Sequence, residues 1–153
     1  MSALELKVPP ALMTTLAGLL QWSLDRALPG MAVDIPAAGW IVAVSGALGV
    51  AFAVGGVLAF AAARTTVDPI RPSKTAAVVQ NGVYQITRNP MYLGFLLFLL
   101  AFAVYLGNPL AFLVLPLFVL AMTRLQIVPE ERALTEKFGE PYRQYLARVR
   151  RWI

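Results

Sequence analysis

Long stretches without charged residues constrain this chain more than any other feature. Residues 35–63 form a run of 29 uncharged positions, and residues 89–123 form a run of 35. A helix crosses the roughly 30 Å hydrocarbon core of a membrane with about 20 apolar residues. The 153 residues are 59% hydrophobic and 14% charged, whereas an average soluble domain is about 25% charged. The sequence therefore predicts an all-α, polytopic integral membrane protein.

A turn signal divides the longest stretch into two helices. A single helix over residues 89–123 would be about 50 Å long, and Gly107-Asn108-Pro109 in its middle favours a turn. We therefore predict a helical hairpin, preceded by two further spans in a single membrane domain that covers residues 1–153. The four predicted spans are residues 11–28, 39–63, 91–106 and 110–128.

The first span is the weakest, and a cleaved signal peptide is the alternative for it. Glu5 and Lys7 give no clear positive excess ahead of the apolar segment, which a signal peptide normally has. With four spans, both termini and the loop 64–90 lie on one side of the membrane. That side holds twelve of the thirteen Lys and Arg residues, and Arg26 lies on the other. The positive-inside rule therefore predicts a cytoplasmic loop and a cytoplasmic tail over 129–153, in a membrane such as the bacterial inner membrane.

Two missing residue types exclude several kinds of chemistry. The sequence has no Cys and no His. It therefore has no disulfide framework, no thiolate nucleophile, no imidazole base and no zinc site built on those ligands, and we predict no metal. A net charge of +5 would suggest nucleic acid in a soluble protein. Here the positive charge flanks the predicted spans, so we expect a lipid bilayer and no nucleic acid as partner. Nothing in the sequence determines the oligomeric state.

Polar residues gather in two of the predicted cytoplasmic segments, and the first ends at Arg88-Asn89-Pro90. Asn favours the N-cap of a helix and Pro its first turn, so the segment can be purely structural, with Arg88 as a charge beside the membrane. A helix N-terminus at the membrane surface is also a binding site for anions. The sequence leaves both interpretations open.

The second polar segment begins at Pro129 and carries Glu130 and Glu131. In a first helical turn the helix dipole would stabilise both carboxylates, but either could instead pair with Arg124 or bind a cationic ligand. An apolar stripe with helical spacing follows, with a break expected near Gly139. An amphipathic helix on anionic lipid would account for this stripe without a binding site. The stripe consists of Leu134, Phe138, Tyr142, Tyr145 and Val149.

Taken in order, these motifs resemble those of the integral membrane methyltransferases, which include isoprenylcysteine carboxyl methyltransferases and phospholipid N-methyltransferases. The matching set is Arg-Asn-Pro-Met-Tyr-Leu-Gly at 88–94, the Gly-Asn-Pro hairpin, Pro-Glu-Glu-Arg at 129–132 and the aromatic and basic tail, over about residues 82–152. The resemblance implies an enzyme that uses S-adenosylmethionine to methylate a lipid-like or small hydrophobic acceptor at the cytoplasmic membrane surface.

The resemblance also assigns residues to the site. It implies that Arg88, Arg148 and Arg151 act at the reacting groups. Prenylcysteine enzymes usually have His where this chain has Asn89, so the phospholipid-methylating branch is closer, and the acceptor stays open between a phospholipid amine, a prenylated thiol carboxylate and another hydrophobic molecule. The residues implied for the S-adenosylmethionine pocket are Tyr84, Arg88, Asn89, Pro90, Tyr92, Gly94, Glu130, Glu131, Tyr142 and Tyr145.

Two other functions are compatible with the sequence. The chain could be a reductase-related member of the same superfamily, although the sterol reductases are much longer. It could also be a non-catalytic four-helix transporter or scaffold. Multidrug transporters of this size need an ionisable residue at mid-membrane, and the predicted spans have none at that depth. The polar residues gather on one side of the membrane instead, which favours a surface site.

Overall fold

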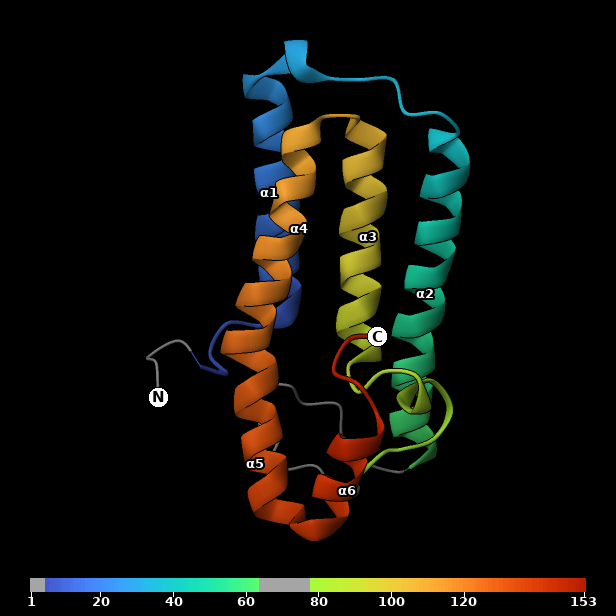
Figure 1. Ribbon diagram of the computed structural model, residues 1–153, viewed down its shortest axis with the longest axis vertical. Helices are drawn as coiled ribbons and strands as arrows, with labels where there is room; N and C mark the ends of the chain where they lie inside the picture. The colour runs from blue at the N-terminus through green and yellow to red at the C-terminus, as the bar shows by residue number, and fades with distance from the viewer. Residues whose placement is uncertain (1–4, 64–77) are drawn as a thin grey trace.

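The computed structural model describes residues 5–63 and 78–153, and these residues form helices and connecting loops without a strand. Figure 1 shows the first four helices running along the long axis, with the fifth continuing the fourth beyond the bundle and the sixth folded back beside it. The helices are α1 (Pro10–Ala27), α2 (Ala38–Ala62), α3 (Pro90–Leu106), α4 (Pro109–Met122), α5 (Val128–Phe138) and α6 (Glu140–Arg148). The shorter turns are η1 (Pro29–Met31), η3 (Gly82–Gln85) and the π-helical η4 (Thr123–Ile127).

Two helices are long and apolar enough to cross a membrane. They are α2, with 25 residues, and the continuous helix Pro109–Phe138, with 30 residues, which joins α4, η4 and α5. The helix α3 is apolar but shorter, and α1 carries Asp25 and Arg26 near its end. The helices expected at 11–28, 39–63 and 91–106 are therefore present within one residue, while the crossing of all four and their orientation stay predictions.

The continuous helix is longer than a membrane is thick. Thirty residues extend about 45 Å, against a hydrocarbon core of roughly 30 Å. All its charges lie from Arg124 onward, and Glu130 and Glu131 lie in α5. The apolar N-terminal part is therefore the segment suited to lipid, and the two carboxylates lie beyond it.

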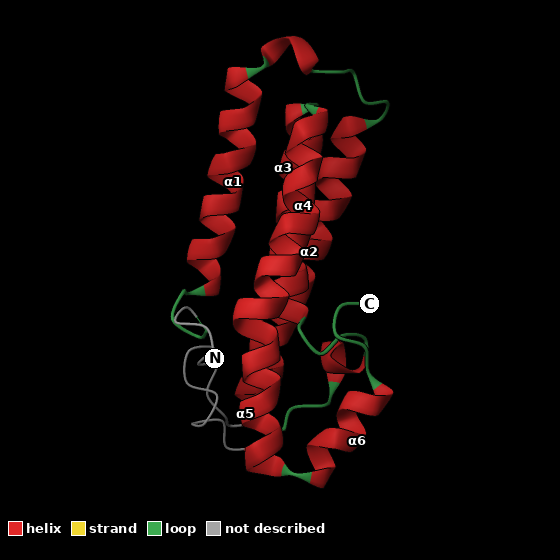
Figure 2. Ribbon diagram, turned by 60° about the vertical axis from the view of Figure 1, so that its left-hand side comes forward, coloured by secondary structure: helices red, strands yellow, loops and turns green. Residues whose placement is uncertain are grey.

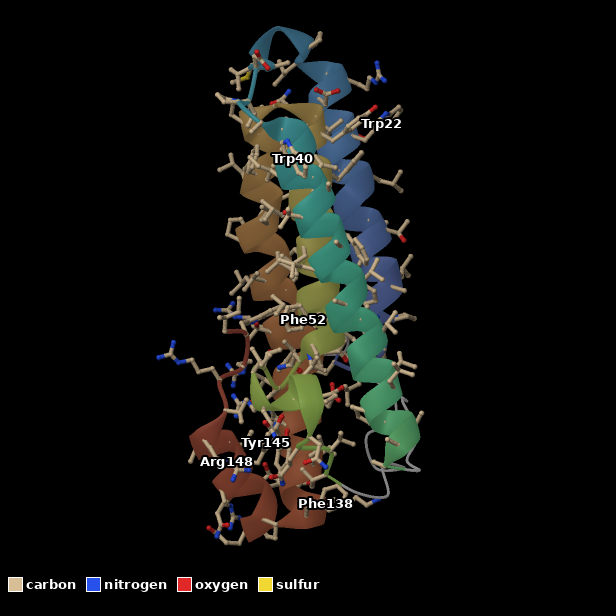
Figure 3. All side chains as sticks on the ribbon, turned by 90° about the vertical axis from the view of Figure 1, so that its right-hand side faces the viewer. Trp22, Trp40, Phe52, Phe138, Tyr145 and Arg148 are labelled. Carbon is tan, nitrogen blue, oxygen red and sulfur yellow. The ribbon has the colours of Figure 1, made fainter. Side chains whose placement is uncertain are left out.

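Two tryptophans lie at the end of the bundle that is farthest from the polar tail. Trp22 and Trp40 lie there, whereas Phe138, Tyr145 and Arg148 lie at the end with the polar tail (Figure 3). Both tryptophans are exposed, and Trp is enriched where a spanning helix meets the membrane surface. This distribution matches a bundle with two distinct interfacial ends.

The predicted hairpin is confirmed at Gly107-Asn108-Pro109. Gly107 ends α3 with a φ of 66°, and the Asn108 side chain accepts a hydrogen bond from the Leu110 N–H at 3.1 Å. The Asn108 side-chain amide also donates to the Leu28 carbonyl at 3.2 Å. One buried side chain thus caps α4 and fixes the end of α1.

The helices α2 and α3 approach closely through small residues. A Cβ added to Gly94 would lie 2.8 Å from the Gly49 carbonyl oxygen and 3.2 Å from the Ala53 Cβ. Small residues allow such close approach of helix backbones in lipid. Gly94, which the resemblance implied for the cofactor pocket, therefore lies at the crossing of two helices.

The helix start expected at Pro129 is not a free helix end. Glu130 and Glu131 do lie in the first turn of α5, but the helical backbone continues into it from α4 through η4. Pro129 has no N–H for the carbonyl of Leu125, and that carbonyl accepts from the Leu6 N–H at 3.0 Å instead. Stabilisation of the two carboxylates by a free helix N-terminus is therefore wrong, because the preceding turn occupies that position.

The predicted break near Gly139 is confirmed, with a φ of 62° at that residue. It turns α6 back toward the bundle, as Figure 2 shows. Tyr142, Tyr145 and Val149 of the apolar stripe are buried, and they pack with Val78, Leu134, Phe138 and Leu146. The stripe therefore builds a small core within the protein and is not a face left for lipid.

Candidate functional site

The C-terminal residues cross the start of α3, and backbone carbonyls hold the two segments together. The Arg88 N–H donates to the Arg150 carbonyl at 3.0 Å. The Thr87 hydroxyl and the Asn89 side-chain amide both donate to the Arg151 carbonyl, at 3.1 and 2.9 Å. Asn89 occupies the N-cap position of α3 as expected, but its side chain makes no capping bond. It joins the tail to the helix start instead.

Glu131 lies between two guanidinium groups at this crossing. Arg88 Nη2 is 3.1 Å from Glu131 Oε1, and Arg151 donates to both carboxylate oxygens, at 3.0 and 2.6 Å. The side chains of Arg88 and Glu131 are only 11% and 13% exposed. Bidentate, partly buried pairs of this kind are the strong class of charge-assisted hydrogen bonds. The three contacts hold this carboxylate in a fixed orientation.

Arg88 has more hydrogen-bond donors than its contact with Glu131 uses. Its Nη1 donates to the Leu146 carbonyl at 3.2 Å, so the side chain links α3, α5 and α6. Its Nε is buried without a hydrogen-bond partner in the part of the chain that the structure describes. A buried donor without a partner is costly, so this atom suits an added acceptor.

Glu130, the neighbour of Glu131, has a different environment. One of its oxygens accepts a hydrogen bond from the Tyr92 hydroxyl at 3.1 Å. Burial raises the pKa of the Glu130 carboxyl to about 7, the Tyr92 hydrogen bond opposes that rise, and the charge of Glu131 adds to it. The two adjacent carboxyl groups thus have different partners: two arginines contact Glu131, and a phenol contacts Glu130.

Three further tyrosines lie close to the charged groups of the crossing. Tyr84, Tyr142 and Tyr145 are buried, and the Tyr145 hydroxyl donates to the Tyr84 carbonyl at 2.8 Å. Burial raises the pKa of the Tyr84 and Tyr142 hydroxyls well above the usual value, and the negative charge of Glu130 raises both further. These phenols stay protonated at neutral pH and can serve as hydrogen-bond donors or apolar walls.

Most of the residues that the sequence assigned to a site lie together at this crossing. Arg148 lies apart from Glu131, since its guanidinium pairs with the Gln80 side chain at 2.7 Å. Gly94 faces α2, as described above. The pairing with Arg124, which the sequence left open for either Glu, is not found among the described residues: Glu131 pairs with Arg88 and Arg151. Pro90 is buried and lies beside Gly56 of α2. The assigned residues that meet are Tyr84, Arg88, Asn89, Tyr92, Glu130, Glu131, Tyr142, Tyr145 and Arg151.

Sequence reasoning missed two residues of the crossing. Thr87 is fully buried, and its oxygen accepts from the Asn89 N–H at 3.2 Å while its hydroxyl donates to the tail. The Trp152 indole N–H donates to the Thr123 hydroxyl at 3.1 Å. A Thr two positions before a helix N-cap is a recognisable local hydrogen-bonding signal. No local signal pairs Trp152 with a residue 29 positions earlier.

Comparison with known proteins identifies the family of this chain. The family model for phospholipid methyltransferases matches residues 39–141, which include α2, the hairpin and α5. The chain belongs to the phospholipid methyltransferase family. No solved structure matches it.

Three relatives extend this result. An uncharacterized protein from Haemophilus influenzae is 49% identical over 63 residues, which cover 41% of this chain and that whole protein. Protein-S-isoprenylcysteine O-methyltransferase B from Arabidopsis thaliana is 36% identical over 80 residues, 52% of this chain and 41% of the relative. Protein-S-isoprenylcysteine O-methyltransferase from Schizosaccharomyces pombe is 32% identical over 77 residues, 50% of this chain and 33% of the relative. This chain thus matches less than half the length of each named methyltransferase.

Proposed function

We propose that this chain transfers a methyl group from S-adenosylmethionine to a lipid-like or small hydrophobic acceptor at the cytoplasmic surface of a membrane. Membership of the phospholipid methyltransferase family supports methyl transfer, and two relatives are named as isoprenylcysteine methyltransferases. The observation that carries the proposal is the cluster of Arg88, Glu131 and Arg151. It is a fixed, partly buried set of charges beside the apolar part of the bundle.

The residues present fit S-adenosylmethionine, whose amino-acid end carries a carboxylate and an ammonium group. The buried Nε of Arg88 has no partner among the described residues and can donate to a carboxylate. Glu131 and Glu130 can accept from the ammonium group or from ribose hydroxyls. When bound, the sulfonium supplies an electrophilic methyl group with a neutral leaving group. Asn89, Pro90, Tyr92 and the three buried tyrosines would line the pocket.

The contribution of the protein is mainly alignment and exclusion of water. Correct placement of the reacting groups can supply about 7–11 kcal/mol of a reaction barrier. The tail across the start of α3 and the core around Tyr142 and Tyr145 enclose the cluster on its polar side. The apolar surface of α1 and α2, which includes Leu16, Leu58 and Trp40, suits contact with lipid. An acceptor could keep its apolar part in the bilayer while its polar end meets Arg148 or Arg151.

Binding of labelled S-adenosylmethionine to the detergent-purified protein tests the proposal. Glu131→Gln should weaken binding about ten- to hundredfold, because a charge-assisted hydrogen bond contributes about 1.5–3 kcal/mol. Glu140→Gln is the matched control, since Glu140 is 65% exposed and, in the part of the chain that the structure describes, forms its ion pair with its helical neighbour Arg143. Equal binding by both variants and the wild type would assign Glu131 to structure alone.

Arg88→Lys separates binding from topology. Lysine keeps the charge that orients the chain but loses the planar fork that bonds Glu131 and Leu146. We expect weaker donor binding with unchanged orientation, whereas Arg143→Lys should change neither. Unchanged donor binding by Arg88→Lys would remove Arg88 from the site. A screen of phospholipid amines and prenylated thiol carboxylates with the wild type would then identify the acceptor.

A further inference from the structure

The two arginines that hold Glu131 differ in how firmly they are themselves held. The Arg88 side chain is 11% exposed, and its Nη1 also donates to the Leu146 carbonyl at 3.2 Å. The Arg151 side chain is 37% exposed, and the hydrogen bonds that the structure describes for its guanidinium both go to Glu131. Arg88 is therefore built into the crossing, whereas the Arg151 guanidinium has one attachment and access to solvent.

The backbone of the tail does not depend on that attachment. The Arg151 carbonyl accepts from the Thr87 hydroxyl and the Asn89 amide, at 3.1 and 2.9 Å. The next residue, Trp152, donates its indole N–H to the Thr123 hydroxyl at 3.1 Å. These bonds hold the main chain across the start of α3 wherever the Arg151 side chain points. The guanidinium can therefore leave Glu131 while the tail stays in place and Arg88 still pairs with the carboxylate.

The charge of the cluster decides which ligand it suits. With both arginines engaged, two positive groups surround the one negative charge of Glu131, and the cluster suits an anion. The amino-acid end of S-adenosylmethionine is a zwitterion, with a carboxylate and an ammonium group on the same carbon. Without Arg151, the Arg88–Glu131 pair offers one charge of each sign, 3.1 Å apart. An ammonium group that approaches Glu131 would be repelled by the Arg151 guanidinium, since both have the same charge.

We propose that Arg151 is an exchangeable counter-ion of Glu131, which the ammonium group of the methyl donor displaces into solvent. This inference rests on the proposed function, in which Glu131 accepts from that ammonium group and the Arg88 Nε donates to the donor's carboxylate. A guanidinium group is larger than an ammonium group, so its departure supplies the space that the ligand needs. Before the donor binds, Arg151 keeps a mostly buried carboxylate paired.

The first test measures the affinity of two ligands by calorimetry on the detergent-purified protein. S-adenosylhomocysteine has the amino-acid end of the donor, and 5′-methylthioadenosine lacks it. Arg151→Gln removes the competitor for Glu131, so it should bind S-adenosylhomocysteine about two- to fivefold more tightly, the range expected for a partly exposed ion pair. Its affinity for 5′-methylthioadenosine should stay that of the wild type. Arg150→Gln is the matched control, because it removes the same charge from an exposed neighbouring position, and it should change neither affinity.

The second test follows the Arg151 guanidinium directly. Phenylglyoxal modifies accessible arginines, and mass spectrometry of the digested protein locates each modified residue. Saturating S-adenosylhomocysteine should increase the modification of Arg151 several-fold, because the side chain released from Glu131 becomes accessible. Arg143, which is 61% exposed, serves as the internal reference and should react equally with and without ligand. The compound 5′-methylthioadenosine should leave the modification of Arg151 unchanged.

The outcomes separate the inference from the proposed function. Weaker binding of S-adenosylhomocysteine by Arg151→Gln would make Arg151 a ligand of the donor and overturn the inference. Equal binding by Arg151→Gln and the wild type would overturn it as well, as would a modification of Arg151 that S-adenosylhomocysteine lowers or leaves unchanged. The proposed function survives each of these results, because the protein still binds the ligand. If the wild type and both variants bind neither S-adenosylhomocysteine nor S-adenosylmethionine, the proposed function fails and the inference fails with it.

Discussion

The crossing of α2 and α3 at Gly94 allows a quantitative test of what this glycine does. A Cβ at position 94 would lie 2.8 Å from the Gly49 carbonyl oxygen and 3.2 Å from both N and Cβ of Ala53. Two of these three neighbours are backbone atoms, so they cannot rotate away, and the two helices must separate. Overpacking of this kind costs about 1–3 kcal/mol.

Gly46 of α2 provides the matched control. A Cβ added there meets no atom of the described residues within 4 Å, so Gly46→Ala should gain the full helix-propensity difference of up to about 1 kcal/mol. Gly94→Ala has the same favourable helix-propensity change, but the overpacking destabilises it as well. The two variants should therefore differ by about 1–3 kcal/mol, and each 1 kcal/mol shifts the Tm by about 2–4 °C in a chain of this length.

The assay is thermal unfolding in detergent followed by circular dichroism. We expect Gly94→Ala to melt below Gly46→Ala by several degrees, while its folded fraction binds S-adenosylmethionine as the wild type does. Equal melting temperatures would refute the close approach of the two helices. A loss of donor binding without a loss of stability would return Gly94 to the pocket that the resemblance implied.

Three further predictions concern topology, pH and the tail. A single cysteine at Arg150 should be protected from an impermeant reagent outside the cell and one at Asp34 should be labelled, and the reverse pattern would invert the orientation. The pKa of Glu130 is raised in the folded protein, so this group binds more protons when the protein is folded, and its contribution to stability should fall as the pH rises from about 5 to 7. Glu130→Gln should therefore reduce the dependence of the melting temperature on pH. An unchanged dependence would contradict the burial of Glu130. Arg151→Lys should increase protease cleavage of the tail, because it loses the two-bond contact with Glu131, whereas Arg143→Lys should not.

Local signals predicted the helices well. Runs without charge and flanking turn residues located α1, α2 and α3 within one residue of their observed ends. Gly107-Asn108-Pro109 and Gly139 marked two chain reversals, and both glycines have the positive φ that makes such positions predictable. These features depend on a few neighbouring residues, and the sequence displays them directly.

The predictions that the structure corrected depend on contacts with residues far away in the sequence. Pro129 predicts a helix start, but the helix continues through it. The N–H of Leu6 donates to the Leu125 carbonyl, which proline has no N–H to satisfy. The sequence indicated Glu131 but not its partners, because Arg88 lies 43 positions earlier and Arg151 20 later. The apolar stripe was correct as a pattern, yet only the fold shows that it packs inward.

The buried hydrogen bonds of Gln21 can form only after later parts of the chain have been synthesised. Its side-chain amide is fully buried and donates to the Leu99 and Ala111 carbonyls, both at 3.1 Å. These acceptors lie 78 and 90 positions later, so a ribosome exposes Gln21 well before either acceptor has been synthesised. During that interval the Gln21 amide, which lies within α1, can bond with water, lipid head groups or the insertion machinery. The helix α1 thus emerges before the α3–α4 hairpin and can complete its buried hydrogen bonds only after the hairpin has been made.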